Sequence, residues 1–157
     1  MTPLEVTAPL SIPVRFLAGV LAGVAATLAM DLVMPRLPEG RTVPAVASGV
    51  LTGRGPDSAP GRLADVVHYL AGALTGPLFV WLLYAGEAVL DGRSPLTTLL
   101  AGAVLYVLMV GFFAVVVLPQ SPVARGRASQ IRRDWALSAL VYVLVLVVLV
   151  GGISGVL

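Results

Sequence analysis

The stretch Arg62-Leu63-Ala64-Asp65-Val66-Val67-His68-Tyr69-Leu70-Ala71-Gly72 opens a long apolar segment and contains the only histidine of the chain. Asp65 and His68 are three residues apart, so on a helix they lie on the same face. The residues that follow are almost uniformly apolar. The stretch therefore predicts the start of a long apolar helix that carries ionisable side chains near one end.

The composition of the chain is that of a membrane protein. Of its 157 residues, 58% are hydrophobic and 11% are charged, and the mean hydropathy is +0.98, whereas soluble domains carry about 25% charged residues. A formal charge of +2, scattered along the chain, does not indicate a nucleic-acid partner. The lack of cysteine excludes disulfides, thiolate metal sites and cysteine nucleophiles. All the basic residues are arginine, which is typical of a GC-rich prokaryotic gene.

Four apolar segments are long enough to cross a hydrocarbon core of about 30 Å, which takes roughly 20 residues. In lipid each must be helical, because the backbone has no water to bond. The chain is therefore predicted to be all-α and polytopic, a single domain with transmembrane helices at about 12–34, 63–84, 95–118 and 135–157. Ser94-Pro95 predicts an N-cap followed by proline at the first helical position. The residues before Arg15 do not resemble a signal peptide, so the first segment is expected to stay as an anchor.

The distribution of arginine predicts the orientation. Eight of the ten arginines fall in the two connections 35–62 and 119–134. They are Arg36, Arg41, Arg54 and Arg62 in the first connection, and Arg125, Arg127, Arg132 and Arg133 in the second. Only Arg15 and Arg93 fall on the other side, so both termini are predicted outside a cell membrane. The second connection either contacts anionic lipid headgroups or carries arginines that only set the topology.

The first connection contains an apolar stretch at 43–51. Thr42 is expected to cap a short helix there, with Pro44 in its first turn. We expect this helix to be interfacial or partly re-entrant in the membrane.

The two halves of the chain share a weak repeat. The ends of the first and third segments both follow the pattern P-x-x-P-x-x-R, at 35–41 and 119–125. Because two helices per unit preserve orientation, the halves would be parallel repeats. Duplicated helical hairpins and chance similarity among apolar segments are both open interpretations.

Small residues predict close helix packing. Gly19-x-x-x-Gly23 and Gly72-x-x-x-Gly76 each allow a neighbouring backbone to approach. Packing within the chain and contact in a homo-oligomer are both consistent with these motifs.

Pro77 predicts a kink in the second helix. The fourth segment, rich in valine and leucine, is expected to face mainly lipid.

Three ionisable residues form the candidate polar cluster: Asp31, Asp65 and His68. Asp31 lies one turn before Pro35, where both the helix dipole and the lipid disfavour a carboxylate, so it needs a partner. On antiparallel neighbouring helices it reaches a depth similar to that of His68. Asp65, like Asp134, is interpreted mainly as a helix-start acid that pairs with an arginine.

The role of the Asp31–His68 pair is open between a buried hydrogen bond that fixes helix register and a function. The functional versions are a proton relay, a ligand contact or part of a metal site. No H-x-x-x-H or H-E-x-x-H spacing supports a metal. Haem would need a symmetric dimer or a methionine such as Met30 or Met34 as second ligand. We therefore expect no metal and no cofactor.

The layout resembles small four-helix prokaryotic membrane proteins, including the YagU-like ones. The resemblance rests on Leu17-Ala-Gly-Val-Leu-Ala-Gly23 leading into Met30-Asp31, and on His68-Tyr-Leu-Ala-Gly72 opening the second helix. It implies the four-helix architecture and carries over no activity.

The functional hypotheses differ in class. The chain has no G-x-S-x-G, P-loop, Rossmann or dense acidic lipid-transfer motif, so we expect no enzyme. The first hypothesis is a small membrane subunit or assembly partner, with the bilayer and a membrane protein or a second copy as its partners. The alternative is an oligomeric solute or proton-linked transporter that uses Asp31 and His68. The third is a metal- or haem-binding membrane protein.

Overall fold

The structure is a computed structural model that describes residues 11–90 and 92–153. Over these residues it is helical and contains no strand. The α-helices are α1 (Ile12–Val33), α2 (Thr42–Thr52), α3 (Gly61–Val89), α4 (Pro95–Phe112) and α5 (Arg125–Ile153). Short 3-10 or π turns join them: η1 (Met34–Arg36), η2 (Pro56–Ser58), η3 (Phe113–Val117) and η4 (Leu118–Gln120).

Four helical stretches are long and apolar enough to cross a membrane, as the sequence predicts. They are Ile12–Arg36, Gly61–Val89, Pro95–Gln120 and Arg125–Ile153. In each, the intrahelical ladder satisfies the backbone groups that lipid cannot bond. The prediction of an all-α protein with four apolar helices long enough to span is confirmed.

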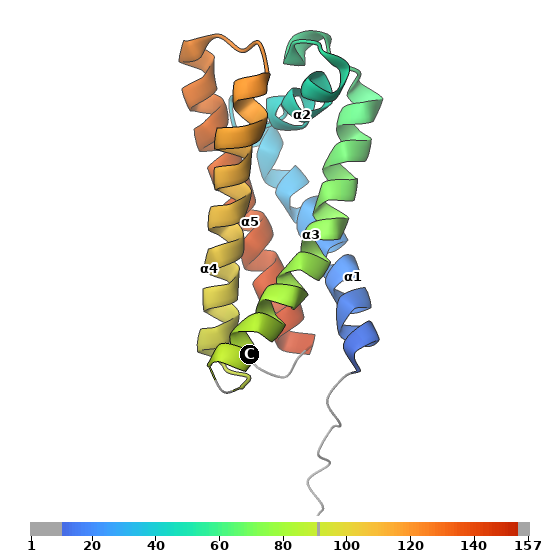
Figure 1. The fold of residues 1–157 in the computed structure, drawn as a ribbon. Coiled ribbons are helices and arrows are strands. Elements are labelled where there is room, and N and C mark those ends of the chain that lie inside the picture. Colours follow the sequence, from blue (N-terminus) through green and yellow to red (C-terminus); the bar gives the residue numbers. More distant parts are fainter. Residues whose placement is uncertain (1–10, 91, 154–157) are drawn as a thin grey trace, which may run out of the picture.

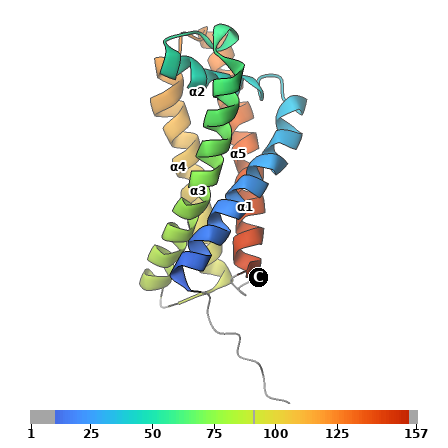
Figure 2. The ribbon, with the colours of Figure 1, turned by 90° about the vertical axis from the view of Figure 1, so that its right-hand side faces the viewer.

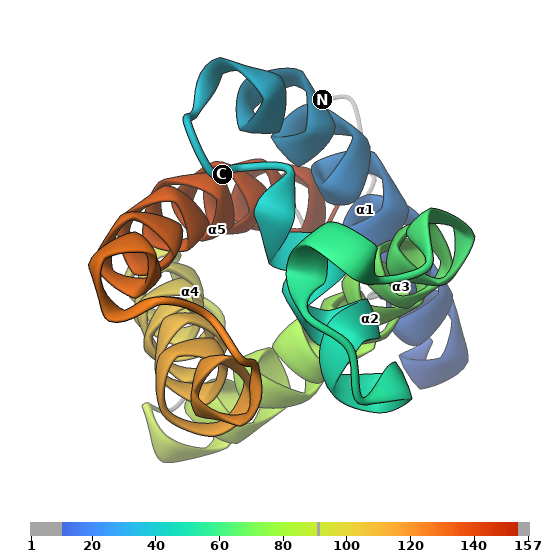
Figure 3. The same ribbon diagram turned by 90° about the horizontal axis from the view of Figure 1, so that it is seen from above.

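The four long helices form a ring of contacts in the order α1, α3, α4, α5 (Figure 1). The start of α1, the end of α5 and the turn between α3 and α4 lie at one end, called here the terminal end (Figure 1). At the opposite end, called the α2 end, α2 lies at the top of the ring on the side of α3 (Figure 3). α1 crosses α3 obliquely and packs against both α3 and α5 (Figure 2).

The two glycine pairs face each other where α1 crosses α3. A Cβ on Gly23 would lie 2.5 Å from the carbonyl oxygen of Gly72, and a Cβ on Gly19 would lie 3.0 Å from that of Gly76. Only glycine permits backbones to come this close. The motifs predicted from spacing therefore pack against one another within the chain.

The fourth apolar helix begins ten residues earlier than predicted. α5 starts at Arg125, and the expected connection 119–134 is mostly its polar first turns. No proline follows Pro122 in this region, and arginine, alanine and glutamine favour helix. Apolar length alone therefore placed the start too late. The last predicted residues, 154–157, lie outside the described part of the chain.

The expectation that this fourth helix faces mainly lipid is wrong. Tyr142 and Leu146 of α5 are fully buried, and α5 packs against both α1 and α4. Valine and leucine suit a protein core as well as lipid, so hydropathy did not distinguish the two environments.

Of the two helix caps predicted from the sequence, one is present and one is not. Ser94 caps α4 as predicted, because its Oγ accepts the backbone N–H of Thr97 at 3.0 Å. The short helix α2 is also present, but Thr42 does not cap it. The Thr42 hydroxyl instead donates to Glu39 Oε2 at 2.5 Å, and Arg41 occupies the cap position without a side-chain bond.

The helix α3 continues through Pro77 and changes direction near its middle (Figure 1).

Candidate functional site

Asp31 of α1 and His68 of α3 form a direct pair near the α2 end. His68 Nε2 lies 2.7 Å from Asp31 Oδ1, and the Tyr69 hydroxyl donates to Asp31 Oδ2 at 2.5 Å. A carboxylate only accepts hydrogen bonds, so the hydrogen in the first contact belongs to His68 Nε2. The side chain of His68 is 9% exposed and that of Asp31 is 31% exposed. The structure thus brings together the two residues whose depths match along antiparallel helices.

Asp65 does not join this pair. It is exposed on the second turn of α3, and it makes no side-chain hydrogen bond or ion pair within residues 11–90 and 92–153. The third member is instead Tyr69, whose hydroxyl bonds Asp31. Its adjacency to His68 was the available signal.

An apolar cavity of about 500 Å³ lies beside His68. Its walls come from α2, α3, the end of α4 with η3, and α5, with one methionine, Met30, from α1. Leu74 and Leu78 of α3 and Phe112 of α4 line the cavity and are also exposed on the outer surface. The cavity therefore opens between α3 and α4, which diverge toward the α2 end (Figure 1).

Four lining residues carry polar side-chain atoms. Trp135 Nε1, the Tyr142 hydroxyl and the Thr75 hydroxyl each donate to a main-chain carbonyl, at 3.1, 2.7 and 2.7 Å. The fourth is His68, whose Nε2 is bonded to Asp31. Its Nδ1 makes no hydrogen bond to any residue that the structure describes. The lining is therefore mostly apolar, and its polar side chains are those of His68, Thr75, Trp135 and Tyr142.

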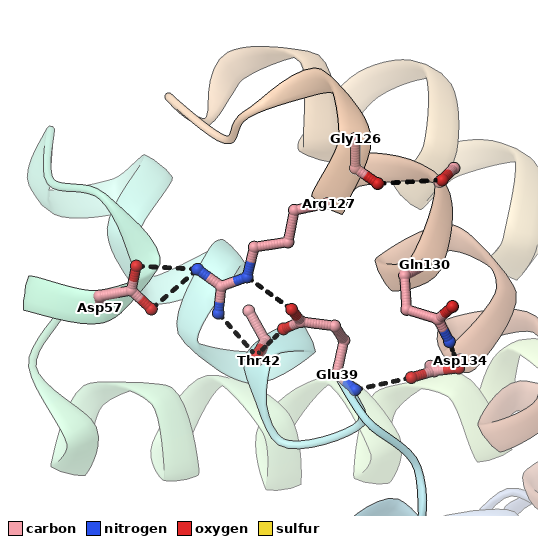
Figure 4. Close-up of polar contacts among 8 residues, drawn as sticks. Glu39, Thr42, Asp57, Gly126, Arg127, Gln130 and Asp134 are labelled. Carbon is pink, nitrogen blue, oxygen red and sulfur yellow. Dashed lines mark hydrogen bonds and ion pairs between the residues drawn. The ribbon is translucent and has the colours of Figure 1, made fainter.

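A second polar cluster, the Arg127 cluster (Glu39, Thr42, Asp57 and Arg127), closes the α2 end (Figure 4). Arg127 Nε donates to Glu39 Oε1 at 2.6 Å, and Nη1 donates to both oxygens of Asp57 at 2.9 and 2.8 Å. These contacts join the first turn of α5 to the residues on either side of α2. The sequence assigned Arg127 to lipid headgroups or topology, but its guanidinium is occupied by protein carboxylates.

The two carboxyl groups of this cluster are held ionised by the arginine. The hydrogen bond from Arg127 lowers the pKa of Glu39 below its ordinary 4.5, and the Thr42 hydroxyl adds to the shift. The same guanidinium lowers the pKa of Asp57 below its ordinary 3.8. Hydrogen bonds to the charged form favour ionisation.

Asp134 has a different place from the helix-start acid that was expected. It lies in the third turn of α5 and is 1% exposed. Its Oδ2 accepts the backbone N–H of Glu39 at 2.7 Å, and Oδ1 accepts the amide of Gln130 at 2.7 Å (Figure 4). The buried carboxylate therefore anchors the connection before α2 onto α5, and its described partners include no arginine.

The remaining arginines of the second predicted connection are exposed. Arg125, Arg132 and Arg133 lie on the outer surface of the first turns of α5. Their position at the α2 end fits the predicted contact with headgroups, and it equally fits a purely topological role.

An ion pair at the terminal end was missed by sequence reasoning. Arg15 of α1 is 3% exposed and donates to both carboxylate oxygens of Glu87 on α3, at 3.1 and 2.8 Å. Its guanidinium also lies 4.3 Å from the ring centre of Tyr84. The signal available was one acid near the end of the second apolar segment and one arginine near the start of the first. Antiparallel packing places both at the same level.

A metal site is not formed by the candidate cluster. In the described parts of the chain, no three His, Cys, Asp or Glu side chains lie close enough to hold a metal ion. Asp31 and His68 supply two ligands at most, and Asp65 is bonded to neither of them.

Comparison with known proteins gave no relative. No family model, no curated protein and no solved structure matches this chain.

Proposed function

We propose that this chain is a non-enzymatic, multi-pass membrane protein that binds a molecule taken up from the bilayer. The observation that carries the proposal is the apolar cavity of about 500 Å³ that opens between α3 and α4. Ligand cavities are typically about 300–1,000 Å³ and mostly apolar with a few polar groups. This cavity matches that description in size and lining.

The position of the opening supports a ligand from lipid. Both helices that border it are apolar enough to span a membrane, and the residues at its edge are leucine and phenylalanine. An unfilled apolar void gives up the dispersion contacts that its lining atoms would otherwise make. A molecule with an alkyl part restores those contacts without crossing water.

The other functions expected from the sequence have less structural support than binding in the cavity. A subunit or assembly role, with a membrane protein or a second copy as partner, would use exposed apolar faces, and these suit lipid equally. Proton-linked transport would use Asp31 and His68, but a buried apolar core that includes Phe79 and Leu146 lies between the polar groups of the two ends. A metal or haem site would need ligands beyond this pair. Binding within the cavity is the function that a specific feature favours.

The orientation and the duplication belong to this proposal. We place the α2 end on the cytoplasmic side of a cell membrane and both termini outside, because eight of the ten arginines belong to the two connections expected there.

We also propose that the two helical hairpins derive from duplication. The matched prolines Pro35 and Pro119 are each the second residue of a 3-10 turn, η1 and η4, which supports that origin.

Quenching of tryptophan by brominated alkane tests the binding role. The chain has two tryptophans, so Trp81→Phe leaves Trp135, which lines the cavity, as the single reporter. In proteoliposomes we expect bromododecane to quench Trp135. Ala71→Phe, which fills the cavity from α3, should reduce this quenching several-fold.

The matched control is Ala85→Phe. Ala85 is also an exposed alanine on α3, but it does not line the cavity. It should leave the quenching unchanged. Equal quenching in the two phenylalanine variants, or none in the parent, would contradict the binding role.

A further inference from the structure

The hydrogen bond between Asp31 and His68 fixes which nitrogen of a neutral imidazole is free to accept a hydrogen bond. The carboxylate requires hydrogen on Nε2, at 2.7 Å. In a neutral imidazole the other nitrogen then carries a lone pair and no hydrogen. Tyr69 donates to the second oxygen of Asp31 and so holds the carboxylate in place. His68, which lines the cavity, therefore offers Nδ1 as an acceptor.

The remaining polar groups of the cavity also lack free donors. The hydrogens of Trp135 Nε1, the Tyr142 hydroxyl and the Thr75 hydroxyl are directed to main-chain carbonyls. The two hydroxyl oxygens keep acceptor lone pairs. Within the described lining, the cavity thus presents acceptors without a matching donor. A ligand that brings a donor pairs with them, whereas an ether, ketone or carboxylate cannot.

His68 lies toward one end of the cavity, and the lining toward the other end is mostly apolar. His68 is in the second turn of α3, close to the α2 end, whereas Leu78 lies ten residues further along the helix. At 1.5 Å per residue this is about 15 Å, mostly along apolar lining. A head group bonded at His68 would leave a chain running toward the middle of α3, beside the opening.

We propose that the cavity binds a long-chain amphiphile with a hydroxyl head group, and that His68 Nδ1 accepts the hydrogen bond from this hydroxyl. The inference rests on the proposed function, since it assumes that the cavity takes a molecule from the bilayer. Asp31 and Tyr69 act as positioning residues, because they fix the imidazole without touching the ligand.

Three brominated probes with the same chain test the inference: bromododecanol, its methyl ether and bromododecane. The ether keeps the oxygen and loses only the donor. The measurement is quenching of Trp135 in proteoliposomes of the Trp81→Phe variant. Because a net hydrogen bond contributes about 1 kcal/mol, the alcohol should reach half-maximal quenching at about five-fold lower mole fraction than the ether.

The variant His68→Leu removes the acceptor and keeps an apolar side chain. It should abolish the difference between alcohol and ether while bromododecane still quenches Trp135, which also shows that the variant is folded. Equal quenching by alcohol and ether in the parent would overturn the hydroxyl assignment while leaving the binding role intact. A preference for the alcohol that persists in His68→Leu would also overturn the hydroxyl assignment. Quenching by none of the three probes would overturn the proposed function itself.

Discussion

Replacing Gly76 by alanine should separate α1 from α3. A Cβ on Gly76 would overlap the carbonyl oxygen of Gly19 and would lie 2.6 Å from its carbonyl carbon, where ordinary contacts begin at 3.4 Å. The helices must therefore move apart by at least 0.8 Å. The obstacle is backbone and cannot rotate away. Overpacking of this kind costs about 1–3 kcal/mol, and the better helix propensity of alanine returns up to about 1 kcal/mol.

We therefore expect Gly76→Ala to lower the free energy of unfolding by about 1–2 kcal/mol. The assay is equilibrium unfolding by SDS in mixed micelles, followed by circular dichroism. Gly111→Ala is the matched control, because a Cβ at this helical position meets no atom within 4 Å. It should be neutral or slightly stabilising. If both variants unfold at the same SDS fraction as the parent, the close crossing of α1 and α3 at these glycines is refuted.

The same assay checks two further predictions. In a double-mutant cycle, Asp31→Asn and His68→Ala should couple by at least about 0.5 kcal/mol, since the residues are in contact; additive effects would show that they act independently. The pKa values of Glu39 and Asp57 are lowered in the folded state, so their contacts with Arg127 stabilise the fold above the ordinary carboxyl pKa and lose that effect as the pH falls through the lowered values. The stability difference between the parent and Arg127→Gln should therefore be full at neutral pH and shrink below about pH 4.5; a difference independent of pH would refute this role of the arginine.

In the described part of the chain, the ion pairs between charged side chains lie toward the two ends of the long helices. Arg15 and Glu87 pair at the terminal end, and the Arg127 cluster closes the α2 end. Between them the buried residues are mostly apolar. The Asp31–His68 pair differs from both, because one of its members lines the apolar cavity between α3 and α4.

The Asp31–His68 pair could be predicted because each residue is unusual and helix geometry fixes depth. An acid in an apolar segment needs a partner, and the rise per residue brought the only histidine to the same level. The cavity could not be predicted in this way. Its walls come from five helices, and its size depends on the angle at which α3 and α4 diverge.

The roles predicted for Asp134 and Arg127 were wrong because both were inferred from local sequence alone. Asp134 was interpreted as a helix-start acid because the apolar pattern begins at Trp135, whereas α5 begins at Arg125 and places Asp134 in a buried turn. Arg127 was assigned to the membrane surface because its partners, Glu39 and Asp57, lie more than sixty residues away in the chain. Local spacing carries no information on such contacts.

The sequence by itself determined that this is an all-helical chain with four helices long and apolar enough to cross a membrane, and where close packing is possible. These properties depend on hydropathy, on backbone hydrogen bonding in lipid and on glycine spacing, all of which are local. The tertiary structure alone decided which apolar faces are buried, which carboxylate each arginine meets and where a cavity opens. Those properties depend on helix crossing angles, which arise from side-chain packing summed over the whole chain.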